Sequence, residues 1–338
     1  MTSIEYKKGL PIGYESFLIE RYNSYIATCR YIEIHYPAHD IYYMLVYDNG
    51  NLVDLLVFGN RKSDAICFNA LVSFNSVVLE ECLRKVFEVY PKIRQIKIDA
   101  SYTEYKLEKS ILVFKSDDQI LFLPATVDEY LSELGAKTRK HLKARKANLE
   151  KEFEQVSFVT KIGGEIEESS IEKIVQFSRA RVKQKGRNFG IDKTYTDNLY
   201  RYSRHYGCVV YLELDGVMVA GCISTIINKE IFVHVIAYDD NFSKYNVGEV
   251  CVFDLIQTSI NNGLVKFHFL WGFNELKRRL QARQNLLFSY MVYRNYSFKY
   301  FSTQLKVILF EFMYRFKDTG MFKPLKTSMS TLRQRMKT

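Results

Sequence analysis

The chain has 338 residues, 47% of them hydrophobic and 25% charged, which predicts a globular protein of two domains and excludes a disordered chain. The six cysteines show no C-x-x-C spacing and the histidines are scattered, so the sequence predicts buried thiols in a reducing compartment and no metal site. No basic-then-apolar leader opens the chain and no apolar run reaches about 18 residues, which predicts a cytoplasmic protein without a transmembrane helix.

The formal net charge of +10 is concentrated in four segments of the chain. Residues 137–151, 179–187, 277–283 and 303–338 carry +6, +5, +4 and +6, while the remainder carries −11. Basic clusters on a mildly acidic body indicate an anionic ligand rather than general supercharging.

Residues 1–125 predict one small α/β unit. An apolar stretch from Ile41 to Phe58 is interrupted by Asp48-Asn49-Gly50-Asn51, which is typical of a β-hairpin. A helix is predicted at 76–90, where Pro91 ends the helical spacing. Further strands are predicted at 65–73, 93–98 and 112–123.

Residues 126–154 predict one long helix that links the two halves of the chain. Its apolar residues fall on one stripe at about 100° per residue; they are Leu131, Leu134, Leu142, Leu149 and Phe153. The basic run "KTRKHLKARK" covers most of the remaining surface. A solvated helix face, a contact with a polyanionic cosubstrate and a contact with nucleic acid all remain open for this run.

Residues 155–302 repeat the order hairpin, strand, helix, strand, although the two sequences do not match. Strands are predicted at 156–160, 209–214, 218–226, 230–238, 267–270 and 287–292, and helices at 170–185, 192–205 and 248–262. A basic and apolar tail, 303–338, contains a predicted helix at 304–317. This helix either packs on the body or contacts a membrane surface or an oligomer partner.

The turn before the helix at 248–262 is a candidate phosphate-binding site. A helix N-terminus presents unpaired N–H groups and the positive end of the helix dipole, and Gly248 allows an anion to approach the backbone. The alternative is a glycine that serves as a plain N-cap. No Walker A lysine and no G-x-G-x-x-G motif is present, which argues against nucleotide hydrolysis and Rossmann cofactors. The candidate cofactor-binding residues are Tyr245, Asn246, Val247, Gly248, Glu249 and Val250.

Three residues are candidate catalytic groups: His234, Glu213 and Tyr238. Strict alternation along the strand at 230–238 places His234 on one face with Phe232, Ile236 and Tyr238. A histidine there acts either as a general base or as a core residue with a satisfied hydrogen bond. Glu213 is a second candidate base, and a charge at a sheet edge is its alternative role.

The segment "FHFLWGFNELKRRLQAR" is the candidate substrate-side motif. A buried strand ends at Trp271 and is followed by Gly272, Glu275 and Lys277, and α/β sites often lie at such a strand end. An exposed turn with solvated charges is the alternative.

Five segments in order resemble a known family: "LPATVDEYLSELGAKTRKHLKARKANLE", "FSRARVKQKGRN", "VYLELDGVMVAGCIS", "AYDDNFSKYNVGEV" and "FLWGFNELKRRL". They are similar to the BioF-like, CelD-type acetyltransferases of the GNAT superfamily, a group related to the Fem-type aminoacyl transferases. The resemblance covers roughly 115–300. It implies tandem GNAT-like domains with mixed central sheets flanked by helices, in which 1–125 is a degenerate copy and 155–302 is the acyltransferase domain.

The resemblance implies an N-acyltransferase that uses acyl-CoA, acetyl-CoA or longer, and no metal. Its acceptor is implied to be an amino sugar, a nucleotide sugar or another cell-envelope or polysaccharide precursor. The residues at 245–250 correspond to the family's pyrophosphate turn, although Tyr245 and Val250 depart from its pattern. The implied acceptor-side residues are Arg181, Lys185, Arg187, Trp271, Gly272, Glu275 and Lys277.

Two alternatives remain beside this reading. The cationic stretch 137–151 suits tRNA, as in a Fem-like transferase that uses aminoacyl-tRNA. A degenerate GNAT pair that binds RNA or a membrane surface through the tail, without catalysis, is the other; a location at the inner membrane surface would follow from it.

Overall fold

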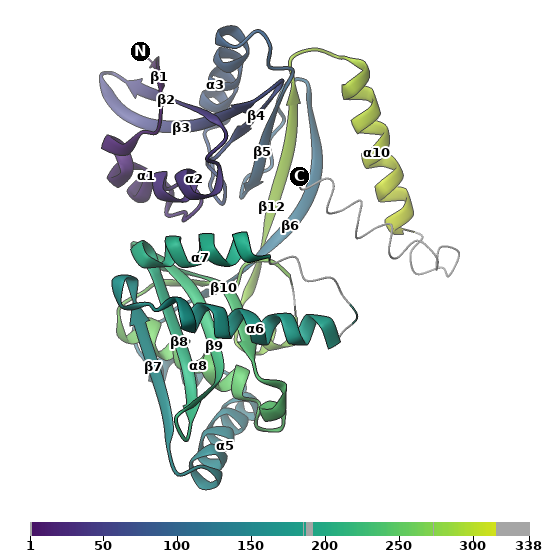
Figure 1. The fold of residues 1–338 in the computed structure, drawn as a ribbon. Helices are drawn as coiled ribbons and strands as arrows, with labels where there is room; N and C mark the ends of the chain where they lie inside the picture. Colours follow the sequence, from purple (N-terminus) through teal and green to yellow (C-terminus); the bar gives the residue numbers. More distant parts are fainter. Residues whose placement is uncertain (1, 185, 187–191, 273, 316–338) are drawn as a thin grey trace. The chain divides into compact units, whose positions relative to one another are not determined.

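The computed structural model describes residues 2–184, 186, 192–272 and 274–315. Contacts between Cα atoms divide the chain into two compact units. Unit 1 contains the described residues of 1–10, 38–115 and 287–338, and unit 2 contains those of 11–37 and 116–286. Both units combine strands and helices, as the sequence predicts (Figure 1).

Unit 1 is a sheet in the order β1-β2-β3-β4-β5-β12, with β4 and β5 parallel and the other pairs antiparallel. Its strands are β1 (Thr2–Lys8), β2 (Asp40–Asp48), β3 (Asn51–Arg61), β4 (Asp64–Cys67), β5 (Gln95–Ser101) and β12 (Arg283–Tyr293), which begins in unit 2. Its helices are α3 (Ser76–Val89) and α10 (Phe298–Arg315).

Unit 2 is a sheet in the order β6-β11-β10-β9-β8-β7, in which only β10 and β11 are parallel. Its strands are β6 (Ser110–Phe122), which begins in unit 1, β7 (Val156–Ile162), β8 (Gly207–Leu214), β9 (Val217–Ile227), β10 (Glu230–Tyr238) and β11 (Lys266–His268). Its α-helices are α1 (Glu15–Tyr22), α2 (Cys29–His35), α4 (Val127–Glu133), α5 (Ala136–Glu152), α6 (Glu168–Gln184), α7 (Lys193–Tyr206), α8 (Val247–Asn261) and α9 (Glu275–Arg279). Three 3-10 helices complete the described chain: η1 (Ile12–Tyr14), η2 (Gly163–Glu165) and η3 (Asp240–Tyr245).

The structure contains the predicted repeat. The elements β1-α1-α2-β2-β3-β4-α3-β5-β6 are followed by β7-α6-α7-β8-β9-β10-α8-β11-β12, allowing for the insertion of α4, α5 and α9. In both copies a hairpin is followed by a strand, a helix and a second strand. The strand before the helix and the strand after it are parallel: β4 and β5 in the first copy, β10 and β11 in the second. The hairpin of the second copy turns at Asp215-Gly216, where both residues have positive φ, as a two-residue turn requires.

The units are interleaved along the chain, whereas the sequence predicts consecutive domains divided near residue 125. The last strand of the first copy, β6, pairs with β11 in unit 2, and the last strand of the second copy, β12, pairs with β5 in unit 1. The segment 11–37 also belongs to unit 2, where the Tyr202 hydroxyl on α7 donates to the carbonyl of Tyr25. Pairing over such sequence distances leaves no trace in local periodicity.

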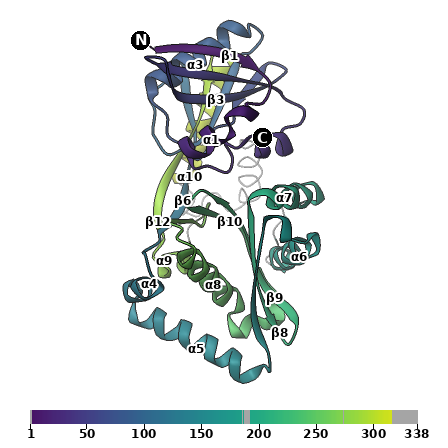
Figure 2. The same ribbon diagram turned by 90° about the vertical axis from the view of Figure 1, so that its left-hand side faces the viewer.

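The sheet of unit 2 is covered on both faces (Figure 2). One face packs against α8 around Val210, Leu255 and Phe267, and the helices α4 and α5 add Tyr130 and Leu142 to this core. The other face packs against α6 and α7, with Ile174, Leu199 and Val235 in its core. Strands buried on both faces are apolar on both faces, which explains the continuous apolar runs in β9 and β10.

The predicted long helix at 126–154 is two helices. Thr126 caps α4 with a capping box to Glu129, and α4 ends where Leu134 takes an extended conformation before Gly135, the N-cap of α5. Leu134, Leu142 and Leu149 are buried in one core as the stripe predicts. Both helices lie within unit 2, so the segment is not a link between two successive domains.

Candidate functional site

The parallel strands β10 and β11 are hydrogen-bonded over only the first part of β10. Pairing runs from Glu230↔Lys266 to Phe232↔His268, although β10 continues to Tyr238. Beyond His268 the chain follows β6, since the N–H of Phe269 donates to the carbonyl of Gln119 at 2.8 Å. Within the described residues, no strand pairs with β10 beyond Phe232 on this edge, so the edge offers backbone donors and acceptors to a ligand.

The open edge leads to the N-terminus of α8. η3 ends at Tyr245, Asn246 adopts a left-handed conformation with φ of 55°, and α8 begins at Val247. The ring of Tyr238, the last residue of β10, lies against Gly248, and the guanidinium of Arg181 on α6 sits 3.9 Å from the centroid of that ring. Three predicted site residues, Arg181, Tyr238 and Gly248, are therefore brought together from three elements.

Gly248 is required by the close approach of Tyr238. A Cβ built on Gly248 would lie 2.4 Å from Cδ1 of Tyr238, while the residue itself has an ordinary helical backbone. The glycine is neither the N-cap nor a position of positive φ. It lies inside the first turn, where its missing side chain lets the ring pack on the helix.

Gly248→Ala is expected to destabilise the protein by about 1–3 kcal/mol, because the ring or the helix must shift. In a Tyr238→Ala background the same change should be neutral or stabilising, since alanine is the better helix former. Urea unfolding of the four proteins measures this coupling. Gly164→Ala is the matched control, because a Cβ there meets nothing within 4 Å. Equal costs of Gly248→Ala in both backgrounds would contradict the packing argument.

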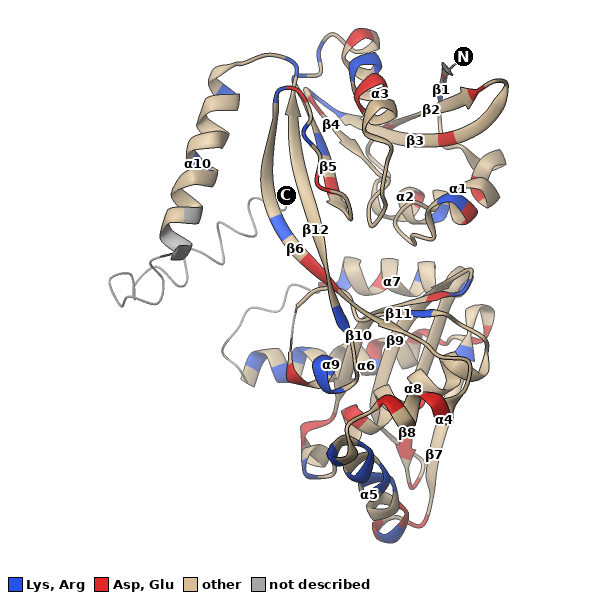
Figure 3. Ribbon diagram, turned by 180° about the vertical axis from the view of Figure 1, so that it is seen from behind, with Lys and Arg blue, Asp and Glu red and all other residues tan. Residues whose placement is uncertain are grey.

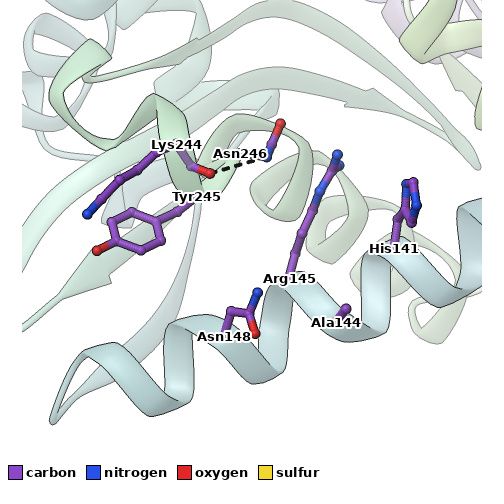
Figure 4. A pocket seen from close by; sticks show the side chains of 7 residues that line it. All are labelled: His141, Ala144, Arg145, Asn148, Lys244, Tyr245 and Asn246. Carbon is purple, nitrogen blue, oxygen red and sulfur yellow. Dashed lines mark hydrogen bonds between the residues drawn. The ribbon is translucent and has the colours of Figure 1, made fainter.

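A pocket of about 310 Å3 lies between α5 and the η3–α8 turn (Figure 4). α5 contributes His141, Ala144, Arg145 and Asn148, and the turn contributes Lys244, Tyr245 and Asn246. Leu142 and Leu149 are buried in the core, and they lie one turn before and one turn after Arg145 on α5. Their burial turns the adjacent side of the helix, with Arg145, His141 and Asn148, toward the turn. The pocket is lined by two basic side chains, Arg145 and Lys244, and by His141, and it adjoins the positive end of the α8 dipole. This arrangement favours binding of an anion.

The buried carboxylate of Glu249 holds α5 and α9 at the first turn of α8. It forms ion pairs with Arg145 of α5 and, at 2.9 Å, with Arg279 of α9. An acidic residue in the first turn also matches the helix dipole. Glu249 was predicted to bind the cofactor, but its geometry gives it another task, which is to orient the arginine that lines the pocket. Val247 and Val250 are buried in the core.

A β-bulge between Val233 and Val235 places His234 on the opposite face from Ile236 and Tyr238, whereas His234 and Phe232 share a face as predicted and both contact the ring of Tyr25. Ile236 and Tyr238 pack with the core under α8, whereas His234 faces Thr225 and Tyr25. Its Nε2 lies 2.7 Å from the Thr225 hydroxyl, and its ring meets the Tyr25 ring edge-on with centroids 4.7 Å apart. Burial, with a smaller effect of His35, lowers the pKa of His234 to about 3. Such a group is a weak base at neutral pH and resembles a satisfied core histidine.

His234→Gln is expected to flatten the acid side of the stability curve. Because the folded pKa is below the unfolded value of about 6.5, only the unfolded chain takes up this proton as the pH falls from about 6.5 towards 3. The parent should therefore lose up to roughly 4 kcal/mol more than the variant over that window. Urea unfolding at several pH values measures the difference. Parallel pH dependences of the two proteins would show that His234 is not buried in its neutral form.

Glu213 lies away from the other two catalytic candidates. It occupies β8 opposite Ser157 and Met218, two strands from β10 and about 10 Å away by strand spacing. By the strand register it is level with the end of β10, near Tyr238, and four to five residues along the strand from His234.

The loop after β11 is organised by Lys277. Its ammonium donates to the backbone carbonyls of Phe269 at 3.0 Å, Leu270 at 3.3 Å and Trp271 at 2.9 Å. Burial lowers the pKa of Lys277 to about 8, against the opposing effect of Asp117 and Asp118. These hydrogen bonds attach the loop at 269–271 to α9. They place Trp271 just after the end of β11.

The other predicted acceptor-side residues are exposed or not described. Trp271 is 40% exposed, Gly272 is exposed with φ of 87°, and Glu275 forms an exposed ion pair with Arg278 at 2.7 Å. Lys185 and Arg187 lie outside the described residues.

The sequence analysis missed a buried charge cluster at the paired end of β10. His268 Nδ1 is 2.6 Å from Asp118, and its Nε2 is 2.9 Å from Glu230, which also bonds Lys266 at 2.6 Å. Burial alone would lower the pKa of His268, but the two carboxylates outweigh it and the pKa is raised. Asp118, Glu230 and His268 come from three strands, so no local motif marks them. Among the described residues, no group of three or more His, Cys, Asp and Glu side chains is arranged to hold a metal ion.

Residues 136–278 match the family model of the acetyltransferase (GNAT) domain. The matched segment runs from α5 to α9 and includes β10, α8 and the open strand edge. No curated protein matches the sequence.

Solved structures show the same fold over most of the chain. The crystal structure of FemX has a TM-score of 0.66 at 10% identity and covers 86% of this chain and 98% of that one. L-PGS from Bacillus licheniformis has a TM-score of 0.57 at 14% identity, covering 90% and 98%. A tandem GNAT protein from the clavulanic acid biosynthesis pathway has a TM-score of 0.51 at 8% identity, covering 87% and 100%. At these identities the likeness concerns the fold.

Proposed function

We propose that unit 2 transfers an acyl group from acyl-CoA to an amine. The open edge of β10, which ends at the N-terminus of α8 beside a basic pocket, carries this proposal. The groups of acyl-CoA follow one another in the same order as the features of this site. Its pantetheine amides suit an unpaired strand edge, and its diphosphate suits a helix N-terminus flanked by Arg145 and Lys244. The GNAT domain match supports the same class of substrate.

The chain's own residues supply binding and orientation. Tyr238, the last residue of β10, packs on the first turn of α8 beside the proposed diphosphate site. Backbone N–H groups of β10 beyond the bulge face the thioester carbonyl and stabilise the oxyanion that develops there. Direct attack by the bound amine then needs only alignment of the two reactants.

The proton of the attacking amine needs an acceptor. The low pKa of His234 and its bond to Thr225 make it unsuited to this role. We assign the role to Glu213, which at about 10 Å from β10 acts through intervening water.

The acceptor is proposed to be an amino sugar or a related envelope precursor. Trp271 presents a partly exposed, flat apolar side chain beside the end of β11, which suits the face of a sugar ring. Arg181 supplies a positive charge for the phosphates of a nucleotide sugar. Lys277 fixes the loop that carries Trp271. A member of the BioF-like, CelD-type group would have this activity.

The test is release of free thiol from acyl-CoA in the presence of amino sugars and nucleotide-linked amino sugars. Thiol release that requires both substrates, and that falls when Trp271 is replaced by alanine, supports the proposal. Release that no amine stimulates would contradict it.

A Fem-like transferase that uses aminoacyl-tRNA is the second candidate. The exposed face of α5 carries a row of lysines, marked blue in Figure 3; they are Lys137, Lys140, Lys143, Lys146 and Lys151. Such a row suits an RNA backbone, and its binding should weaken steeply with salt. Tight, salt-sensitive tRNA binding without acyl-CoA binding would favour this candidate.

A further inference from the structure

The helix α10 exposes large apolar side chains in a single stripe. The exposed fractions of these residues lie between 51% and 89%; they are Phe298, Phe301, Leu305, Ile308 and Leu309. At about 100° per residue they fall within an arc of about 100°. Five aligned side chains of this size form a contiguous apolar surface, which monomeric proteins rarely leave uncovered.

The opposite face of α10 is held by unit 1. Thr303 accepts a hydrogen bond from the Tyr293 hydroxyl at 2.8 Å, the ring of Tyr300 packs edge-on against that of Tyr293, and Lys299 pairs with Asp64 at 3.3 Å. Val307 lies on this side and is half-buried. These contacts fix one side of the helix and direct the apolar stripe outward.

The charges around the stripe determine what covers it. α10 contains Lys299, Lys306 and Arg315 against one acid, Glu311, and residues 316–338 carry six further basic residues and one acid. A second copy of the chain, with a net charge of +10, would bring like charges together. A partner must cover the apolar stripe and must also carry negative charge opposite the basic residues. An anionic partner with an apolar interior does both.

We propose that α10 is a membrane-docking helix that lies in the surface of an anionic phospholipid bilayer. Its Phe, Leu and Ile side chains enter the acyl boundary while the exposed Lys306, which flanks the stripe, contacts the headgroups. The helix lies on the bilayer rather than through it, since no helix in the described part of the chain is long and apolar enough to cross a membrane. The proposal does not depend on the acyltransferase activity, because it concerns another surface.

Co-sedimentation of the full chain with vesicles tests the proposal. Vesicles of phosphatidylcholine are compared with vesicles in which phosphatidylglycerol replaces part of that lipid. The stripe variant combines Phe301→Gln, Leu305→Gln and Ile308→Gln. The matched control combines Ile12→Gln, Val77→Gln and Val217→Gln, which alters three exposed apolar residues elsewhere.

The parent and the control should bind the anionic vesicles, and the stripe variant should bind at least ~10-fold more weakly. A Phe301→Trp reporter should shift its emission to the blue on addition of these vesicles, and a Val77→Trp reporter should not. Failure of the parent to bind, or equal binding of parent and stripe variant, would overturn the proposal. A parent that instead dimerises through the stripe and ignores vesicles would also overturn it.

Discussion

Reversing charge on both sides of the basic pocket is expected to weaken binding of acyl-CoA by about 100-fold. The variant combines His141→Glu on α5 with Lys244→Glu on the turn, and neither residue belongs to the Arg145–Glu249–Arg279 cluster that supports the helices. The new carboxylates would face the ligand's diphosphate across the N-terminus of α8. Calorimetric titration measures the change in affinity.

Two comparisons make this experiment specific. The control variant His205→Glu/Lys229→Glu carries the same change of charge at exposed positions away from the pocket and should bind like the parent. Acyl-pantetheine lacks the diphosphate, so the pocket variant should bind it as the parent does. Equal loss of acyl-CoA affinity in both variants would show that net charge, and not the pocket, governs binding.

Replacing His268 by glutamine is expected to destabilise the protein by about 3–5 kcal/mol, because it leaves two buried carboxylates without their shared partner. His268 is 2% exposed and Asp118 is fully buried, so water cannot replace the lost interaction. Lys266→Met removes only the half-exposed member of the cluster and should cost about 0–1 kcal/mol. Thermal and urea unfolding give both values.

The pH dependence provides a second readout of the same cluster. Because the folded pKa of His268 is raised, its contribution to stability is complete below the unfolded pKa of about 6.5 and is lost as the pH rises through the folded value. The parent's advantage over His268→Gln should therefore shrink at alkaline pH. A triple variant that adds Asp118→Asn and Glu230→Gln should recover part of the stability. A single variant as stable as the parent would contradict the assignment.

The elements of the fold were predictable where local chemistry specifies them. The apolar segments 209–214 and 218–226 on either side of Asp215-Gly216 predict the hairpin, and the helical spacing at 248–262 predicts α8; the structure confirms both elements. The order of elements in the two halves correctly predicts the repeat. What could not be predicted is the exchange of β6 and β12 between the two units, because it depends on pairing between distant segments.

The roles of the candidate site residues stay predictions. The resemblance assigns the turn at 245–250 to the cofactor and Arg181 to the acceptor, and in the structure Arg181 and Gly248 both contact the ring of Tyr238. The bulge at His234 could not be predicted, since one inserted residue reverses the face of a strand without a local signal. Lys277 is predicted to bind the acceptor and Glu249 the cofactor, whereas their partners in the structure are backbone carbonyls and arginines that only the folded chain brings near.

Calorimetric titration of the purified full chain with acetyl-CoA and longer acyl-CoAs, at two salt concentrations, tests the central claim most directly. We expect micromolar binding that weakens moderately with salt, with a preference among acyl chains that identifies the donor. The absence of binding to every acyl-CoA would contradict it, because the open edge of β10 and the pocket beside α8 would then serve another ligand.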